Sequence, residues 1–257
     1  MKPKALIMSG YGLNCEEETK YAFESAGGKA DIIHINDLID GKKKLNNYQI
    51  IAFPGGFSYG DDTGSGNAFA LKTKSHLSEK ISQFIERGNL VIGICNGFQI
   101  LARLGLFPVH FALTHNDSAR YIVRWVDMKI KNNSPWLRGI DRISLPIAHG
   151  EGKLFAENAT MTLLKNKNMI ALKYIKGEIC HYQILDANPN GSLEDIAGIT
   201  NEDGNLFGLM PHPERALFFT NLPHWPYLKE LYLREKQSVP KIGPGHAIFK
   251  NAISYFL

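Results

Sequence analysis

A cysteine framed by two glycines is the residue of this sequence best suited to covalent chemistry. Cys95 lies in Gly93-Ile94-Cys95-Asn96-Gly97, after an apolar run at 90–94 and before a helical pattern at 98–104. A sharp strand-to-helix turn strains the backbone of a nucleophile, and a glycine two residues away on each side lets that turn close. The dipole of the following helix favours the thiolate. We interpret Cys95 as a nucleophile for acyl groups; the alternative is a small buried cysteine without chemistry.

A histidine and a glutamate between prolines could serve that nucleophile. The segment is Pro211-His212-Pro213-Glu214-Arg215. In extended backbone, residues i and i+2 face the same way, and the prolines favour extended backbone, so His212 and Glu214 are predicted to share a face. Glu214 would then accept a hydrogen bond from His212 and fix its tautomer. A lone His-x-Glu is usually part of a surface loop, but here an apolar run at 206–210 leads into the motif, as a strand that ends at an active site would.

A glycine-rich loop is a candidate for binding developing negative charge. Pro54-Gly55-Gly56-Phe57-Ser58-Tyr59-Gly60-Asp61-Asp62 follows an apolar run at 48–53. Adjacent glycines allow a backbone N–H to turn into a pocket, as an oxyanion hole requires. A flexible loop and a phosphate cradle are the alternatives. However, neither this loop nor Gly150-Glu151-Gly152-Lys153 completes the phosphate-binding pattern G-x-x-x-x-G-K-[ST], so we expect no nucleoside triphosphate site in this chain.

The other cysteines are weaker candidates for a nucleophile. Cys15 precedes Glu16-Glu17-Glu18, whose charges disfavour a thiolate, and we expect it to line the same end of the sheet as Cys95. Cys180 has no glycine framing and is interpreted as structural. Three cysteines, an odd number without any CxxC, suit a reducing compartment rather than a disulfide framework. The nine histidines include no HExxH, so no metal site is expected.

Composition limits the kind of protein further. The chain has 257 residues, 44% hydrophobic and 21% charged, which is ordinary for a globular protein with a normal core. Its net charge of +4 comes from scattered Lys and Arg without interleaved aromatics, so nucleic-acid binding is not expected. The apolar runs are too short for a signal peptide or a membrane span, and we expect a cytoplasmic protein that does not contact a membrane.

Short apolar runs alternate with helical patterns in the first half of the chain. The predicted strands are residues 4–8, 31–35, 48–53 and 90–94, and the predicted helices are residues 16–26 and 75–87. This alternation predicts an α/β fold with a flavodoxin-like, doubly wound and mostly parallel sheet and helices on both faces. In such sheets the working residues lie in loops at the carboxyl ends of the strands, here 9–15, 54–67 and from Cys95 onward.

The second half of the chain is less regular. The predicted strands are residues 121–131, 142–147, 169–174, 196–200 and 206–210, with a hairpin turn at Asn201-Glu202-Asp203-Gly204. The sheet is therefore expected to finish with antiparallel strands. Residues 221–245 hold prolines and aromatic clusters and are interpreted as an insertion. We predict a single domain over residues 1–257.

The motifs together resemble the class I (triad) glutamine amidotransferases. Those that carry the resemblance are the Cys95 elbow, Pro-Gly-Gly at 54–56 and Pro-His-Pro-Glu at 211–214. Within that family, the sequence is more similar to the glutaminase subunits of phosphoribosylformylglycinamidine synthases, which act in purine biosynthesis. Asn96 and Phe98 make this distinction, because most relatives with other acceptors have Leu and His there. Further matches are Gly-Leu-Asn-Cys at 12–15, Ala-His-Gly-Glu-Gly at 148–152 and Asn-Gly-Ser-Leu-Glu-Asp-Ile-Ala-Gly at 190–198. The resemblance covers roughly residues 4–218; shorter members end soon after Pro-His-Pro-Glu-Arg, without the segment at 221–245.

The resemblance implies a mechanism for this chain. Cys95 would attack the side-chain amide carbon of L-glutamine while the backbone N–H groups of Gly56 and Asn96 hold the oxyanion. His212, oriented by Glu214, would protonate the leaving ammonia and then activate water to hydrolyse the thioester.

The resemblance also implies binding residues and partners. Gln99, Gly150 and Glu151 match positions that recognise glutamine. Since the chain has no predicted ATP site, ammonia must be used on another polypeptide. That partner is expected to be the large synthetase subunit of phosphoribosylformylglycinamidine synthase, which would bind ATP, Mg²⁺ and formylglycinamide ribonucleotide. A further small accessory subunit is expected in the complex, and the chain itself is expected to need no cofactor.

Three alternatives stay open on the sequence. The glutaminase could serve another acceptor, in guanylate, anthranilate or imidazole-glycerol-phosphate synthesis, although Asn96 and Phe98 argue against it. The same sheet could carry a cysteine hydrolase or peptidase, which would not require Pro-His-Pro-Glu at a strand end. The chain could also be a scaffolding subunit with a dead site, although the intact Cys95, His212 and Glu214 argue against it.

Overall fold

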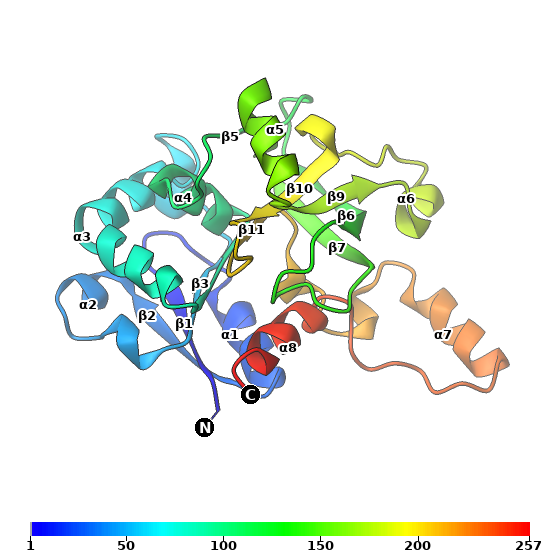
Figure 1. Ribbon diagram of the computed structural model, residues 1–257. Helices are drawn as coiled ribbons and strands as arrows, with labels where there is room; N and C mark the ends of the chain where they lie inside the picture. The colour runs from blue at the N-terminus through cyan, green and yellow to red at the C-terminus, as the bar shows by residue number, and fades with distance from the viewer. Residues whose placement is uncertain (1) are drawn as a thin grey trace.

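The computed structural model describes residues 2–257 and is built on one nine-stranded sheet of order β2-β1-β3-β4-β11-β10-β9-β6-β7 (Figure 1). The strands on the β2 side, as far as β11, pair in parallel. Those from β11 to β7 pair antiparallel. The predicted α/β fold with a doubly wound sheet, parallel in its first part and finished by antiparallel strands, is confirmed.

The strands of the main sheet follow the predicted apolar runs closely, whereas β5 and β8 were not predicted. The strands are β1 (Lys4–Ser9), β2 (Lys29–His34), β3 (Ile50–Phe53), β4 (Leu90–Ile94), β5 (Ala112–His115), β6 (Ile122–Ile130), β7 (Arg142–His149), β8 (Glu151–Phe155), β9 (Ile170–Ile175), β10 (Ile196–Thr200) and β11 (Leu206–Leu209). Every residue of β3, β4, β10 and β11 is buried, as expected for central strands covered on both faces. The turn predicted at 201–204 joins β10 to β11, with Gly204 at φ +74°.

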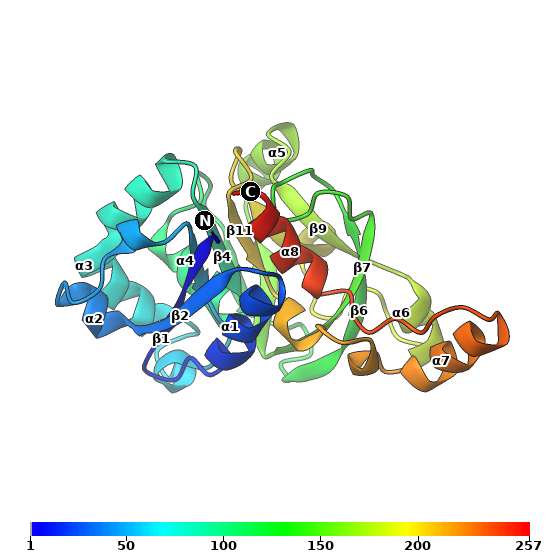
Figure 2. The ribbon, with the colours of Figure 1, turned by 90° about the horizontal axis from the view of Figure 1, so that it is seen from below.

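Helices cover both faces of the sheet (Figures 1 and 2). They are α1 (Glu16–Ser25), α2 (Ile35–Ile39), α3 (Asn67–Glu86), α4 (Asn96–Leu104), α5 (Asn158–Asn166), α6 (Glu178–Gln183), α7 (Trp225–Arg234) and α8 (His246–Ser254). Short 3-10 helices are η1 (Leu45–Asn47), η2 (Ser58–Asp61), η3 (Leu193–Asp195), η4 (Pro213–Arg215) and η5 (Phe219–Asn221). In both views α3 and α4 lie on one side of the parallel strands, and α1 and α8 lie together on the other.

Helix α3 is longer than the sequence pattern predicted. It begins at Asn67, two turns before the predicted start at residue 75. Gly66 precedes it in the left-handed conformation, and the added turns bury Phe69, Ala70 and Thr73. The glycine-rich sequence before Asn67 made this region resemble a loop, whereas it is the close approach of Gly66 to Gln99 and Ile100 of α4 that requires glycine there.

A small second sheet lies beside the site end of the main sheet and was not predicted. Strands β5 and β8 pair antiparallel, from Ala112 opposite Phe155 to His115 opposite Glu151. Both strands are short, so their sequences carry little periodicity. The sheet places the loop that follows β5 against the end of β7.

The segment at 221–245 leaves the body of the protein and returns to it. Its two ends are joined by hydrogen bonds, from Phe219 N to Lys241 O at 3.1 Å and from Gly243 N to Leu217 O at 2.8 Å. Between them, α7 buries none of its residues and projects from the body (Figures 1 and 2). The interpretation of this segment as an insertion, and of residues 1–257 as a single domain, stays a prediction.

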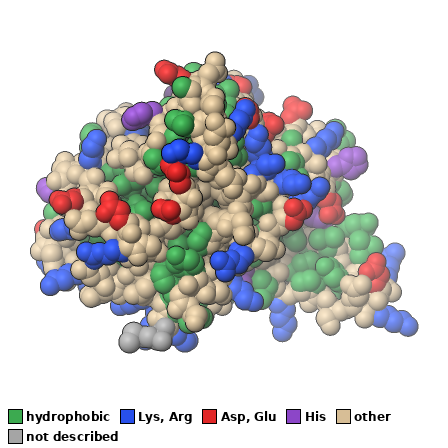
Figure 3. Space-filling view, in the orientation of Figure 1, with side chains coloured by type: hydrophobic (Ala, Val, Ile, Leu, Met, Phe, Trp, Pro, Cys, Tyr) green, Lys and Arg blue, Asp and Glu red, His purple; other side chains and the backbone are tan. Residues whose placement is uncertain are grey.

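Charges of both signs are interspersed over the face drawn in Figure 3, with hydrophobic side chains gathered over α7. The exposed large apolar residues in that region include Tyr227 and Leu233. Within residues 2–257, no helix has the length and apolar character needed to cross a bilayer.

Candidate active site

Cys95 occupies the turn between β4 and α4. Its backbone has φ 51° and ψ −107°, a strained conformation for a residue with a side chain, and it precedes the first residue of α4. Its backbone N–H donates to Leu209 O at 2.8 Å, which ties the turn to the neighbouring strand β11. The side chain is buried, with 5% exposure. The predicted strained strand-to-helix turn is confirmed.

As predicted, the two positions that frame Cys95 require glycine, because neither has space for a side chain. A Cβ on Gly97 would lie 1.9 Å from Phe53 O, and a Cβ on Gly93 would lie 2.7 Å from Gly97 O. Both obstacles are backbone atoms, which cannot move aside as a flexible side chain could. The turn can therefore close only with glycine at both positions.

His212 and Glu214 form a buried pair at the end of β11. The imidazole Nδ1 donates to Glu214 Oε1 at 2.5 Å, and the residues are 2% and 3% exposed. The backbone N–H of His212 donates to Pro146 O at 2.8 Å, which anchors the motif to β7. His212 Nε2 has no hydrogen-bond partner among the described residues, so it is the nitrogen left for chemistry.

The backbone of this motif differs from the prediction. His212 is extended, with φ −106° and ψ 90°, but Pro213–Arg215 form the 3-10 helix η4 rather than extended chain. Pro213 is the first residue of that turn, where its missing N–H costs no hydrogen bond. The prediction of extended backbone was therefore wrong for residues 213–215, although the predicted hydrogen bond between His212 and Glu214 is present.

The environment of His212 favours its charged form. Burial disfavours the imidazolium, but the negative charges of Glu214 and Cys95 outweigh burial and raise the pKa of His212 well above its usual value. A His212 that is readily protonated suits the acid–base partner that a cysteine nucleophile requires.

Gly56 and Asn96, the predicted oxyanion donors, lie in the loops that follow β3 and β4. A Cβ on Gly56 would lie 2.6 Å from Gly12 O, and within residues 2–257 no backbone acceptor takes its N–H. Asn96 is the first residue of α4, where the backbone N–H has no partner inside the helix. Its side chain accepts from Ser58 N at 3.0 Å and so joins the two loops.

Two of the predicted glutamine-binding residues, Gln99 and Glu151, are hydrogen-bonded to each other. Gln99 Oε1 accepts from Asn96 Nδ2 at 2.8 Å, and Gln99 Nε2 donates to Glu151 O at 2.6 Å. Gly150 connects β7 to β8, and the Glu151 carboxylate accepts from Ser65 N at 3.4 Å. Since both ends of the Gln99 amide are bonded within the protein, its contribution in this arrangement is to hold Asn96 and Glu151 in place.

Cys15 lies beside His212, which confirms that it lines the same end of the sheet as Cys95. It immediately precedes α1, is fully buried, and accepts a hydrogen bond from Arg215 Nη2 at 2.9 Å. Donor atoms of Cys15, His212 and Glu214 lie within 4.8 Å of one another. Within this cluster His212 Nδ1 donates to Glu214 Oε1, and the Cys15 sulfur accepts from Arg215. Arg215 is 200 residues from Cys15 in the chain, and no sequence pattern indicated the contact.

Two aromatic rings lie at the mouth of the site and were not predicted. Phe57 and Tyr121 pack with ring centroids 5.9 Å apart, and both are about half exposed. The Tyr121 hydroxyl donates to Ala148 O at 2.9 Å, the carbonyl that the Cys95 sulfur contacts at 3.6 Å. Burial and the negative charge of Cys95 raise the pKa of Tyr121. Tyr121 is thus joined to the nucleophile through the Ala148 carbonyl.

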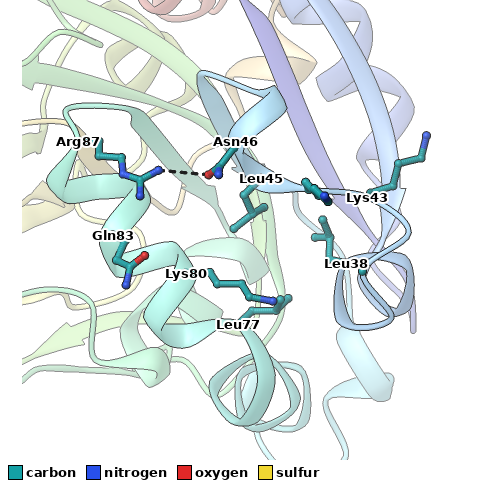
Figure 4. A pocket seen from close by; sticks show the side chains of 10 residues that line it. Leu38, Lys43, Leu45, Asn46, Leu77, Lys80, Gln83 and Arg87 are labelled. Atoms are coloured by element: carbon teal, nitrogen blue, oxygen red, sulfur yellow. Dashed lines mark hydrogen bonds between the residues drawn. The ribbon is translucent and has the colours of Figure 1, made fainter.

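A cavity of about 330 Å³ lies elsewhere, between the C-terminal half of α3 and the loop that precedes η1 (Figure 4). Its basic residues are Lys43, Lys44, Lys80 and Arg87. Figure 4 shows Lys43 extending away from Lys80, and Arg87 donates to Asn46 Oδ1 at 3.3 Å. No nucleophile or oxyanion donor lines this cavity, so it is not the catalytic site.

The chain is similar to glutamine amidotransferases over its whole length. A family model of the CobB/CobQ-like glutamine amidotransferase domain matches residues 2–256. Phosphoribosylformylglycinamidine synthase subunit PurQ of Methanococcus maripaludis is 48% identical, over 100% of this chain and 99% of that protein. The subunit PurQ of Dehalococcoides mccartyi is 41% identical, over 99% and 98%. A chain in the structure of PurLQS from Thermotoga maritima has a TM-score of 0.74 and 32% identity, covering 100% of both chains.

A cysteine in a strand-to-helix turn, beside a histidine–carboxylate pair at a neighbouring strand end, defines the class of cysteine-dependent amidotransferases and hydrolases on doubly wound sheets. The fold alone is shared with another glutamine amidotransferase from Thermotoga maritima, at a TM-score of 0.56 and 15% identity. With full-length identity of 48%, the chain belongs to the PurQ family of phosphoribosylformylglycinamidine synthase subunits, within the glutamine amidotransferases. The resemblance stated from the sequence is confirmed.

Proposed function

We propose that this chain hydrolyses L-glutamine at Cys95 and passes the ammonia to a synthetase subunit of phosphoribosylformylglycinamidine synthase. The observation that carries the proposal is the buried His212–Glu214 pair, hydrogen-bonded at 2.5 Å, at the strand end next to the Cys95 turn. The family to which the chain belongs supports the same reaction.

The first half of the proposed reaction forms a thioester. The Cys95 thiolate attacks the side-chain carbonyl carbon of glutamine, and the carbonyl oxygen becomes an oxyanion within reach of the N–H groups of Gly56 and Asn96. His212 gives its Nε2 proton to the amide nitrogen as the carbon–nitrogen bond breaks, and ammonia leaves. Glu214 stabilises the imidazolium before that transfer and keeps Nδ1 protonated after it.

The second half releases glutamate. Neutral His212 takes a proton from water as the water oxygen attacks the thioester carbon. The carbon–sulfur bond breaks, and the thiolate and imidazolium are restored. One glutamine and one water thus give one glutamate and one ammonia, and no cofactor in this chain takes part.

The acceptor reaction belongs to the partner in this proposal. The synthetase subunit would bind ATP, Mg²⁺ and formylglycinamide ribonucleotide and would aminate that nucleotide with the ammonia. A small accessory subunit would complete the assembly. The solved structure that contains a similar chain is that of PurLQS, which supports an assembly of this kind. The proposal places the protein in the cytoplasm, where purine synthesis supplies its substrates.

The test compares two nitrogen sources in the assembled complex. With Cys95→Ala, glutamine-dependent amidation should fall below detection, while amidation from added ammonium chloride should continue at the rate of the unmodified complex. Cys180→Ala is the matched control, since Cys180 is buried in α6 and takes no part in the site. It should retain both activities. Release of ammonia from glutamine by the Cys95→Ala complex would falsify the proposal.

A further inference from the structure

A buried asparagine outside the proposed catalytic residues ties two segments of the site together. Asn116 follows β5 and is 2% exposed. Its backbone N–H donates to Gly150 O at 2.9 Å. Its side-chain Nδ2 donates to His149 O at 2.8 Å and to Arg120 O at 2.9 Å. The loop 116–121 is thereby fastened to the end of β7.

The same side chain fixes the tautomer of His149. Asn116 Oδ1 lies 3.1 Å from His149 Nδ1. Because Nδ2 of this amide already donates to two carbonyls, the atom facing the ring is the oxygen, which can only accept. His149 Nδ1 therefore carries the proton, and Nε2 is left as a lone-pair acceptor. Nε2 is buried without a hydrogen-bond partner among residues 2–257.

The ring of His149 is held neutral and in one position. Burial lowers the pKa of His149 to about 3, and the positive charge of His212 acts in the same direction. A Cβ on Gly152 would lie 2.6 Å from His149 Nδ1 and 2.7 Å from its Cε1. Glycine at 152 thus leaves space for the ring, which accounts for the last residue of the His-Gly-Glu-Gly motif.

The segment held by Asn116 touches the nucleophile at one end and a proposed glutamine-binding residue at the other. Ala148 O contacts the Cys95 sulfur at 3.6 Å and accepts from the Tyr121 hydroxyl at 2.9 Å. Glu151 O accepts from Gln99 Nε2 at 2.6 Å. A shift of this segment would therefore move groups on both sides of the Cys95 sulfur.

We propose that Asn116 is a positioning residue of the glutaminase reaction, acting through His149 and Gly150 to hold residues 148–151 in the geometry in which glutamine meets Cys95. The inference rests on the proposed function of Cys95. Asn116 itself bonds only to protein groups, so its effect is on the placement of substrate rather than on proton transfer.

Two substitutions separate this role from a general loss of structure. Asn116→Asp keeps the shape and the acceptor oxygen but removes both donors, and Asn116→Ala removes the whole contact. In the complex with the synthetase, both should raise the KM for glutamine about 10- to 100-fold, more than they lower kcat. Amidation from ammonium chloride should stay within about twofold, because it does not use this site.

The matched control is another asparagine that joins two segments away from the site. Asn132 Nδ2 donates to Asn168 O at 3.2 Å and to Thr200 Oγ1 at 2.8 Å. Asn132→Ala should leave the KM for glutamine unchanged. If the unmodified complex releases no ammonia from glutamine, the proposed function itself fails. If it does and the Asn116 variants have the KM of Asn132→Ala, the positioning role is overturned.

A measurement on the unmodified chain tests the hydrogen bond between Asn116 and His149 without any Asn116 variant; His149→Gln serves only to assign the signals. In ¹⁵N NMR spectra, His149, assigned by its absence from His149→Gln, should show a protonated Nδ1 and an unprotonated Nε2, unchanged between pH 5 and pH 8. A proton on Nε2, or titration of His149 within that interval, overturns the inference.

Discussion

The pKa values of two buried histidines at the site, His212 and His149, are shifted in opposite directions by the groups that contact them. Burial disfavours the charge on both rings. At His212 the charges of Glu214 and Cys95 overcome burial and raise the pKa. At His149 the partner is the neutral amide of Asn116, and the pKa falls to about 3. One imidazole is thereby prepared for proton transfer and the other for a fixed hydrogen-bonding role.

Replacing the carboxylate should separate these effects at His212. In Glu214→Gln, the carboxylate charge no longer opposes burial, so the pKa of His212 falls and the imidazolium that protonates the leaving ammonia is less populated. We expect kcat for glutamine to drop roughly 10³- to 10⁴-fold, as when the carboxylate of a triad is lost. Steady-state kinetics of the complex measure this loss, with the exposed Glu235→Gln as control. A loss of less than tenfold would show that Glu214 does not orient the base.

His149 should make the protein less stable in mild acid. Its folded pKa of about 3 lies below the ordinary histidine pKa of 6.5, so the unfolded chain binds a proton more readily. The stability contributed by the neutral ring is therefore present above pH 6.5 and is lost as the pH falls toward 3. Between pH 7 and pH 5 this costs about 2 kcal/mol.

The measurement is urea unfolding at both pH values. His212 also contributes to the pH dependence of stability. Because its folded pKa is raised, the stability that it adds is present below pH 6.5 and is lost as the pH rises through that folded pKa. Both proteins compared contain His212, so its contribution cancels. His149→Gln should lose about 2 kcal/mol less between pH 7 and pH 5 than the unmodified chain. Equal losses in the two proteins would exclude a depressed pKa at His149.

At the scale of elements, the position of the nucleophile Cys95 depends on how closely α4 approaches β3. A Cβ on Gly97 would lie 1.9 Å from Phe53 O, so Gly97→Ala must push the helix from the sheet. We expect a loss of about 3 kcal/mol or more in the free energy of unfolding, together with loss of glutaminase activity. Urea denaturation of the isolated chain and assays of the complex measure both.

Gly105, at the other end of α4, is the matched control. It has φ +71°, but a Cβ there would meet nothing within 4 Å. Gly105→Ala should cost only the strain of the left-handed conformation, about 1–2 kcal/mol, and leave activity intact. Equal costs for the two substitutions would mean that close packing of Gly97 is not what requires glycine.

The elements that the sequence predicted are those with a strong local signal. The strand at 90–94 and the strand at 196–200 have the predicted bounds, because continuous apolar runs mark strands buried on both faces. The first turns of α3 were missed because closely spaced glycines precede them, and α7 because prolines in residues 221–245 indicated an irregular segment. For α3, tertiary contacts with α4 rather than propensity decide where the helix begins.

At the scale of the whole molecule, the sequence predicted which residues belong to the site better than it predicted the contacts between them. Cys95 and His212 were identifiable because glycines and prolines beside them constrain the backbone locally. The contact of Cys15 with Arg215 and that of Asn116 with His149 join residues 200 and 33 positions apart. The first pair follows from the order of strands in the main sheet, which places the ends of β1, β3, β4 and β11 side by side. The second pair depends on the small sheet of β5 and β8, which brings Asn116 to the end of β7.

The two ends of the chain are joined by packing of α8 on α1 (Figures 1 and 2), which should make the C-terminal helix part of the cooperative core. Phe249 is fully buried, and its ring meets that of Phe23 edge to face with centroids 5.0 Å apart. Phe249→Ala should therefore cost about 3–5 kcal/mol. Leu233→Ala in α7, where the side chain is 52% exposed, should change stability by less than about 0.5 kcal/mol. Both values come from urea unfolding followed by circular dichroism. A cost below about 1 kcal/mol for Phe249→Ala would mean that α8 detaches before the sheet unfolds, and that the insertion and α8 together form an appendage rather than part of the core.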